Sequence, residues 1–154
     1  MSVGKSLLAL LALAIAITAL ATLAEEAYAS HTDCRTEQGG SSTSYYYLQE
    51  CYYYDYRERP IRYTYRAENR SWGSGNSQST ENITETWSYY DNNNNNNNNS
   101  LLKDHCRSSS YNGSWSGPGY AGSTSSTRED CEKYDSSARL IERKKVDEYR
   151  INSC

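Results

Sequence analysis

Residues 45–66, YYYLQECYYYDYRERPIRYTYR, decide the fold class of this chain. Nine of these 22 residues are tyrosine, which favours strands because its ring covers a pleated surface while its hydroxyl reaches water. Residues 52–57 and 61–66 each resemble a strand, and Pro60, which cannot donate to a central ladder, lies between them. The stretch therefore predicts a β-hairpin whose connection is made by residues 58–60.

The predicted hairpin has two faces, because successive side chains of a strand point to opposite sides. One face is expected to line a small core, and the other to expose tyrosine and arginine to a partner, as in many recognition surfaces. The alternative is that tyrosine fills the core in place of phenylalanine, which the chain lacks. The candidate binding surface consists of Tyr52, Tyr54, Tyr56, Tyr63, Tyr65, Arg62 and Arg66.

The N-terminal segment has the pattern of a secretory signal peptide. Lys5 precedes an apolar run over residues 7–23, and Ala27-Tyr28-Ala29 places small residues before a cleavage site at Ser30. Residues 1–29 are therefore predicted to be removed, and the protein is expected to be secreted. The alternative is a retained apolar helix, which would act as a membrane anchor or as the core of a pilin-like filament.

Composition limits what the mature chain can do. After Ala29 there remain 15 basic and 17 acidic residues, a near-neutral balance that provides no strong field toward nucleic acid or a membrane surface. Only nine isoleucine, leucine and valine residues remain, too few for an ordinary core of this length. The fold is therefore expected to need covalent bridges, oligomerisation or both.

All five cysteines follow Ala29, and secretion favours disulfides over metal ligation. The simplest pairing is Cys34–Cys51 and Cys106–Cys131, although spacing alone does not fix connectivity. In the chain-entropy model each bridge contributes about 3 kcal/mol. Cys154 is then left unpaired, as a free thiol or as an intermolecular bridge.

An internal repeat supports this pairing. The pattern Cys-x-x-Tyr-Asp-x-x-x-Arg-x-Ile starts at Cys51 and again at Cys131. We therefore expect a small, mostly β, antiparallel domain of two related halves, residues 30–90 and 101–154, joined by an asparagine-rich linker at 91–100. Residues 82–90 are predicted to form a further strand, 70–80 a polar turn region, and 107–127 a loop with at most one short strand. The tail at 138–151 is compatible with a helix, but the repeat favours a strand.

Four sequons, Asn-x-Ser/Thr, accompany the predicted signal peptide. A glycosylated extracellular surface is therefore expected. The candidate glycosylation sites are Asn69, Asn82, Asn98 and Asn112.

The sequence contains no pattern typical of a catalytic site. Residues 113–117, GSWSG, differ from a nucleophile elbow because Trp115 occupies the place of the serine. His31 and His105 each precede a cysteine, but zinc would need thiolates that an oxidising compartment opposes. We expect no enzyme activity, cofactor, metal or nucleic-acid partner.

These observations favour a secreted structural or adhesive subunit that associates with itself, or with another extracellular protein, through a tyrosine-rich β surface. A lectin-like module is the main alternative, because exposed aromatic rings beside polar groups can also stack on sugars. Its candidate residues are Tyr52, Tyr54, Tyr56, Trp72 and Trp115.

Overall fold

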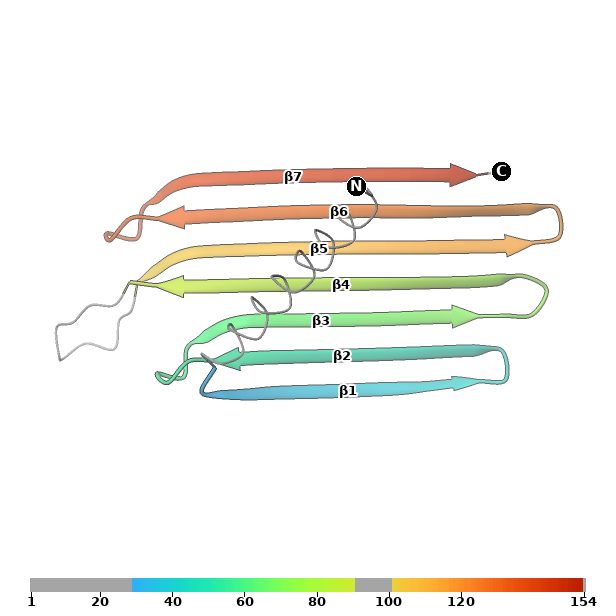
Figure 1. The fold of residues 1–154 in the computed structure, drawn as a ribbon, viewed down its shortest axis with the longest axis horizontal. Coiled ribbons are helices and arrows are strands. Elements are labelled where there is room, and N and C mark those ends of the chain that lie inside the picture. Colours follow the sequence, from blue (N-terminus) through green and yellow to red (C-terminus); the bar gives the residue numbers. More distant parts are fainter. Residues whose placement is uncertain (1–28, 91–100, 154) are drawn as a thin grey trace, which may run out of the picture.

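The computed structural model describes residues 29–90 and 101–153. This part of the chain contains no helix and forms one antiparallel sheet of seven strands (Figure 1). The strands are β1 (His31–Ser41), β2 (Ser44–Tyr54), β3 (Pro60–Ser71), β4 (Asn76–Tyr89), β5 (Leu102–Gly117), β6 (Tyr120–Tyr134) and β7 (Leu140–Ser153).

The sheet is a meander in which every strand pairs with the next one in sequence. The strands run side by side in one layer, with β1 and β7 at the two edges (Figure 1). Pairing of β4 with β5 extends from Asn76↔Ser116 to Tyr89↔Leu102, so the sheet continues across the position of the asparagine tract. The segments before and after the asparagine tract, predicted as two halves, therefore contribute strands to a single sheet.

Local sequence explains several turns. Between β5 and β6, Pro118 and Gly119 form the centre of a tight turn, and Gly119 has a φ of 80°. Proline fixes the first central residue of a type II turn, and glycine tolerates the positive φ of the second. The β1–β2 connection contains only Ser42 and Thr43, which continue the serine-rich sequence around it.

The two faces of the sheet differ strongly in chemistry. We call one the aromatic face, because most rings and aliphatic groups of the inner strands alternate onto it. Its main apolar members are Tyr46, Leu48, Tyr52, Tyr54, Tyr63, Tyr65, Ile83, Trp87, Tyr111, Trp115, Tyr149 and Ile151.

The opposite side, here called the polar face, carries hydroxyl and amide groups on its central strands. They include Gln78, Thr80, Asn82, Thr84 and Thr86 on β4, Ser108, Ser110, Asn112 and Ser114 on β5, and Ser123, Ser125 and Thr127 on β6. Both disulfides also lie on this face.

No second layer covers either face within the described ranges. Cys51, 5% exposed, is the only buried hydrophobic residue there, and Asp55, 7% exposed, is the only buried polar one. The expectation that one hairpin face lines a small core is therefore wrong for this part of the chain. Aliphatic residues are too few, and those of β7 are exposed at an edge.

Several local predictions are confirmed. The central hairpin is formed by β2 and β3, the tail forms strand β7, and the disulfides are Cys34–Cys51 and Cys106–Cys131. The predicted connection of the hairpin at 58–60 is wrong, because β2 ends at Tyr54 and residues 55–59 form the turn, with Pro60 as the first residue of β3. The predicted loop at 107–127 is wrong, because β5 and β6 pair along almost their whole length. The polar turn region at 70–80 is likewise mostly strand, and the turn itself is limited to residues 72–75.

Some predictions concern residues outside the described ranges. These are the apolar segment of the predicted signal peptide, the asparagine tract, the sequon at Asn98, and the unpaired Cys154. The other three sequons lie in strands, with Asn69 on β3, Asn82 on β4 and Asn112 on β5.

Candidate interaction surface

The aromatic face is densest where β2 and β3 pair. Tyr52 lies opposite Tyr63, and their ring centroids are 4.7 Å apart. Tyr54 continues this group, with its ring 6.3 Å from that of Tyr52 and stacked at 4.6 Å on the imidazole of His31. Cross-strand aromatic pairs of this kind stabilise a sheet and arrange the rings as a nearly continuous surface.

The polar ends of these tyrosines are partly anchored. The hydroxyl of Tyr63 donates to Oε1 of Glu50 at 3.2 Å. Burial, together with the nearby Glu50 carboxylate, raises the pKa of Tyr63 to about 12. This ring therefore stays neutral at physiological pH and presents an apolar surface whose orientation is fixed by its hydrogen bond.

The predicted binding residues do not all lie together. Four of them, Tyr52, Tyr54, Tyr63 and Tyr65, share the aromatic face. Tyr56 lies in the β2–β3 connection and is 71% exposed.

The two predicted arginines lie on the polar face instead. The guanidinium carbon of Arg62 is 5.2 Å from the centroid of the Tyr53 ring, and Arg66 pairs with Glu68 along its own strand. They belong to a surface different from that of the tyrosine cluster, because residues of even and odd number alternate between faces of β3.

A second aromatic group on the same face is formed by β4 and β5. Trp87 stacks on His105, with ring centroids 5.5 Å apart. Glu85 lies beside them, 3.5 Å from Nε2 of His105 and 2.8 Å from Nη1 of Arg107. The aromatic face thus extends beyond the tyrosine-rich hairpin, and this extension was missed because each residue is isolated in sequence.

Glycines opposite aromatic residues let rings lie against the sheet. Gly39 pairs with Tyr46, and Gly122 pairs with Trp115. A Cβ atom at Gly122 would lie only 2.4 Å from Cζ2 of the Trp115 ring, and one at Gly39 would lie 2.7 Å from Cε1 of Tyr46. A side chain at either glycine would displace the ring. The two glycines therefore allow the rings of Tyr46 and Trp115 to lie directly against the backbone of the neighbouring strand.

Two turns of identical construction connect β2 to β3 and β6 to β7. In the first, Oδ1 of Asp55 accepts the backbone N–H groups of Arg57 and Arg59 at 2.8 and 3.0 Å, and Nε of Arg59 donates to Oδ2 at 2.7 Å. The fourth residue, Glu58, has a positive φ of 60°. We call this arrangement an Asp–Arg turn.

The second Asp–Arg turn reproduces each of these features. Asp135 accepts the N–H groups of Ser137 and Arg139 at 2.8 and 3.0 Å, Nε of Arg139 donates at 2.9 Å, and Ala138 has a φ of 60°. The aspartate and arginine of the sequence repeat therefore build the turns that set the direction of β3 and β7.

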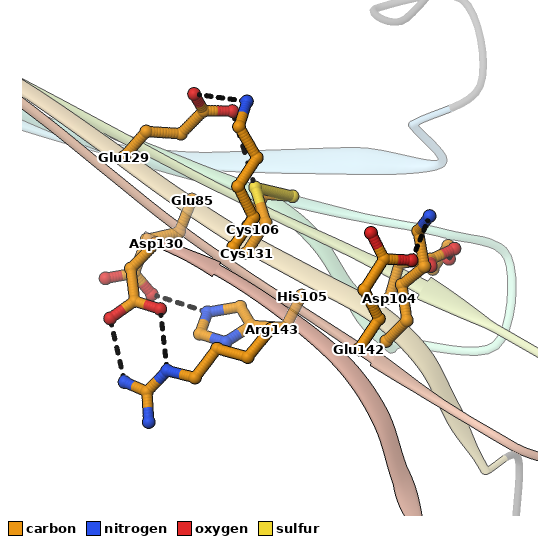
Figure 2. Close-up of a disulfide and its surroundings, with 12 residues drawn as sticks. Glu85, Asp104, His105, Cys106, Glu129, Asp130, Cys131, Glu142 and Arg143 are labelled. Atoms are coloured by element: carbon orange, nitrogen blue, oxygen red, sulfur yellow. Dashed lines mark hydrogen bonds and ion pairs between the residues drawn. A yellow bond between two sulfur atoms is a disulfide. The ribbon is translucent and has the colours of Figure 1, made fainter. Parts of the chain in front are cut away.

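Figure 2 shows both faces of the sheet around the Cys106–Cys131 disulfide. Cys106, Cys131 and Glu129 project from one side of the strands, while His105, Asp130 and Arg143 project from the other. Arg143 forms two hydrogen bonds to Asp130, at 3.1 and 2.9 Å, and this contact holds the pKa of Asp130 below its usual range.

Strand β7 forms an exposed edge rich in charges of both signs, which was not predicted as a site from the sequence. On its inner side it pairs with β6 through Lys133–Glu142 at 2.9 Å, Lys144–Glu129 at 3.0 Å and Arg128–Asp147 at 3.4 Å. Every residue of β7 is nevertheless exposed. The signal that could have identified it was the high density of charged residues in the segment, with a basic run at 143–145 followed by an acidic pair at 147–148.

Among residues 29–90 and 101–153, no group of three or more histidine, cysteine, aspartate or glutamate side chains could hold a metal ion. No helix in that part is long and apolar enough to cross a membrane. Comparison of the chain with protein-family models, with characterised proteins and with solved structures gives no match. The described sheet exposes an aromatic face, a hydroxyl-rich face and two strand edges.

Proposed function

We propose that this protein is a secreted, non-enzymatic structural or adhesive subunit that self-associates by stacking the aromatic faces of two copies. The observation that carries the proposal is that most rings of the inner strands lie on one uncovered face of a single-layer sheet. Two such faces can pack about 10 Å apart, with their side chains interdigitated as in a β-sandwich.

Stacking would complete the core that the chain lacks. Tyr46, Tyr52 and Tyr111 are 46%, 43% and 38% exposed, although they lie within or beside the ring clusters. Covering the exposed part of one tyrosine, roughly 90 Å² of a ring of about 200 Å², contributes on the order of 2 kcal/mol. Several rings in each copy therefore offer enough burial for a stable association.

We also propose that the two halves of the chain are related by duplication. Each half has a disulfide between its first two strands and an Asp–Arg turn before its third. The disulfides are compatible with an extracellular location, which the proposed signal peptide and glycosylation would require.

The test compares two tyrosine pairs on the same strand. Tyr52→Ser with Tyr54→Ser removes rings from the aromatic face, whereas Tyr45→Ser with Tyr47→Ser removes rings from the polar face. Sedimentation equilibrium should show the association that depends on face-to-face stacking weakened at least 100-fold in the first variant and nearly unchanged in the second. Equal association of both variants would contradict the proposal, and formation of both disulfides, checked by mass, shows that each variant folds.

Carbohydrate binding is a second candidate. It is favoured by a shallow hollow between Trp72 and Trp115, which is also lined by Arg70, Asn76 and Gln78. A monomeric protein that binds an immobilised glycan, and loses binding in Trp115→Ala but not in Tyr45→Ser, would support this candidate and contradict assembly.

A further inference from the structure

We propose that β7 pairs with β7 of a second copy, in antiparallel orientation, around a two-fold axis that passes beside Val146. This inference rests on the proposed function and deepens it, because it names a junction between copies that extends the sheet in its own plane. Aromatic-face stacking acts perpendicular to that plane, so the two contacts can be tested separately.

The backbone of β7 defines which residues can pair. Non-hydrogen-bonded partners in an antiparallel sheet approach to about 4.5 Å, against about 5.5 Å for hydrogen-bonded ones, and the Cα atoms of Cys106 and Cys131 are 4.1 Å apart. The N–H and C=O groups of Cys131 therefore face β7, where its partner is Lys144. Even-numbered residues of β7 thus direct their backbone groups to β6, as the carbonyl of Arg150, which accepts from Thr124, also indicates.

Odd-numbered residues of β7 direct their backbone groups to the open edge. An antiparallel partner must place its own odd-numbered residues opposite them. In a two-fold symmetric pair, the residue at the centre then fixes the whole register. Centring on Val146 places Lys145 and Asp147 opposite each other, as hydrogen-bonded partners on both sides of the axis.

In this register the side chains of every residue pair are compatible. With Val146 opposite its own copy, each acidic residue of the strand faces a basic one, and the remaining positions are compatible. The partners are Lys145 with Asp147, Lys144 with Glu148, Arg143 with Tyr149, Glu142 with Arg150, and Ile141 with Ile151. Opposite charges and apolar or cation–aromatic contacts directly across a ladder stabilise pairing.

Neighbouring registers lack this agreement. Moving the centre to residue 145 places Lys145 opposite itself and Glu142 opposite Glu148. Moving it to residue 147 places Asp147 opposite itself and Lys144 opposite Arg150. Each shift by one pleat therefore brings like charges together, which destabilises cross-strand pairs, and the Val146 register is selected.

Charged edge strands often prevent pairing between sheets, and this is the competing explanation for β7. The complementary order of its charges argues against that role, since repulsion between copies would need like charges to meet. The charged side chains of β7 also remain exposed enough to pair with a second copy, although several of them contact β6. The side chains of Glu148 and Arg150 are 62% and 76% exposed, and that of Lys144 is 58% exposed although it pairs with Glu129. Figure 2 shows Glu142 and Arg143 at this outer strand, already oriented by their contacts with β6.

A cysteine scan measures the register directly. In a Cys154→Ser background, Val146→Cys is expected to form a disulfide-linked dimer under mild oxidation, because the two copies of residue 146 face each other as a non-hydrogen-bonded pair. Lys145→Cys and Asp147→Cys are expected to remain monomeric on the same non-reducing gel. Efficient cross-linking at residue 145 or 147, or none at 146, would overturn the proposal.

Charge reversal tests the same junction without cysteine. Glu148→Lys places a lysine opposite Lys144 of the second copy, and Lys144→Glu places a glutamate opposite Glu148. Both reversals are made in the Tyr52→Ser with Tyr54→Ser background, which removes face-to-face stacking, so that association reports β7 pairing alone. Each variant alone is then expected to associate on the order of 10- to 100-fold more weakly, because two symmetry-related pairs become repulsive. Mixing the two variants restores opposite charges in both pairs, and a heterodimer is the expected result. Absence of heterodimer after mixing contradicts the junction.

Two controls separate this proposal from others. Lys103→Glu, an exposed reversal on β5, should leave association unchanged, which excludes a general effect of net charge. The Tyr52→Ser with Tyr54→Ser variant should keep the cross-link at residue 146 while losing face-to-face stacking. Loss of the cross-link in that variant would show that the two contacts are not independent and would contradict the geometry proposed here.

Discussion

Asp55 and Asp135 accept the same set of hydrogen bonds but differ in burial. Mutating each to alanine is therefore a matched test of how much burial adds to the stabilisation by an Asp–Arg turn. The side chain of Asp55 is 10% exposed and that of its partner Arg59 is 17% exposed. For Asp135 and Arg139 the corresponding values are 25% and 78%. Arg59 is also held by the ring of Tyr89, whose centroid is 4.5 Å from the guanidinium carbon.

The expected costs follow from where each arginine goes after the mutation. In Asp55→Ala the guanidinium of Arg59 stays largely buried without its carboxylate, and breaking a buried pair in this way costs about 3–5 kcal/mol of unfolding free energy. In Asp135→Ala the exposed Arg139 returns to water. The loss is then mainly that of the carboxylate acceptor for two backbone N–H groups, about 1–2 kcal/mol by analogy with helix caps.

Urea unfolding followed by circular dichroism measures the difference. The expected difference in unfolding free energy is about 1–4 kcal/mol. With a slope of about 1–3 kcal/mol per molar, the midpoint of Asp55→Ala should lie below that of Asp135→Ala by about 1 M for central values of both. If Asp55→Ala fails to fold, Asp55→Asn and Asp135→Asn provide the comparison, because the amide oxygen still accepts the backbone hydrogen bonds while the charge is lost. Equal midpoints for the two sites would refute the argument from burial.

Three further predictions concern stability at acid pH, the titration of Tyr63 and the packing of the aromatic face. Burial alone raises the pKa of Asp55, but hydrogen bonds from Arg59 and Arg57 lower it overall. The pKa of Asp135 is also lowered, mainly by the backbone N–H of Arg139. The urea midpoint should therefore be constant above about pH 5 and fall below about pH 4, as the two carboxylates become protonated. The pKa of Tyr63 is raised to about 12, so the stabilisation provided by the neutral Tyr63 is present below about pH 10 and lost toward pH 12. Absorbance at alkaline pH should show one late-titrating tyrosine, and this signal should be absent in Tyr63→Leu. Gly122→Val should displace the Trp115 ring, shift tryptophan fluorescence toward that of an exposed indole and cost about 1–3 kcal/mol of unfolding free energy, whereas Ser123→Val on the polar face should leave the emission unchanged.

The sequence was informative where local chemistry is strong. Alternating tyrosines and Pro60 predicted the central hairpin, and the repeated Cys-x-x-Tyr-Asp pattern predicted both the disulfide pairing and strand β7. It was misleading for β5 and β6, whose serine and glycine residues carry little strand preference of their own. Those strands are held by backbone pairing on both sides, a long-range property that a local pattern does not contain.

The candidate surface was only partly predictable for the same reason. Four of the predicted tyrosines share a face because they are two residues apart or directly opposite across the β2–β3 ladder. The members contributed by β4 and β5, such as Trp87 and Trp115, are brought to that face by strand register alone. Arg62 and Arg66 were included among the same candidate binding residues, but they alternate with Tyr63 and Tyr65 along β3 and therefore lie on the polar face with Tyr53.

Because this sheet has no second layer in the part of the chain that the structure describes, its stability depends on contacts between neighbouring strands. These include the backbone hydrogen bonds, two disulfides, two Asp–Arg turns and the cross-strand ion pairs. Each of these holds neighbouring strands together, and none covers the rings of the aromatic face. The two proposed contacts between copies act in the directions that the chain leaves open. Stacking would bury the aromatic face, and β7 pairing would satisfy the edge that the last strand exposes. Because one contact lies perpendicular to the sheet and the other within its plane, each copy could use both at once, and together they would link more than two copies, whereas either contact alone would end at a dimer.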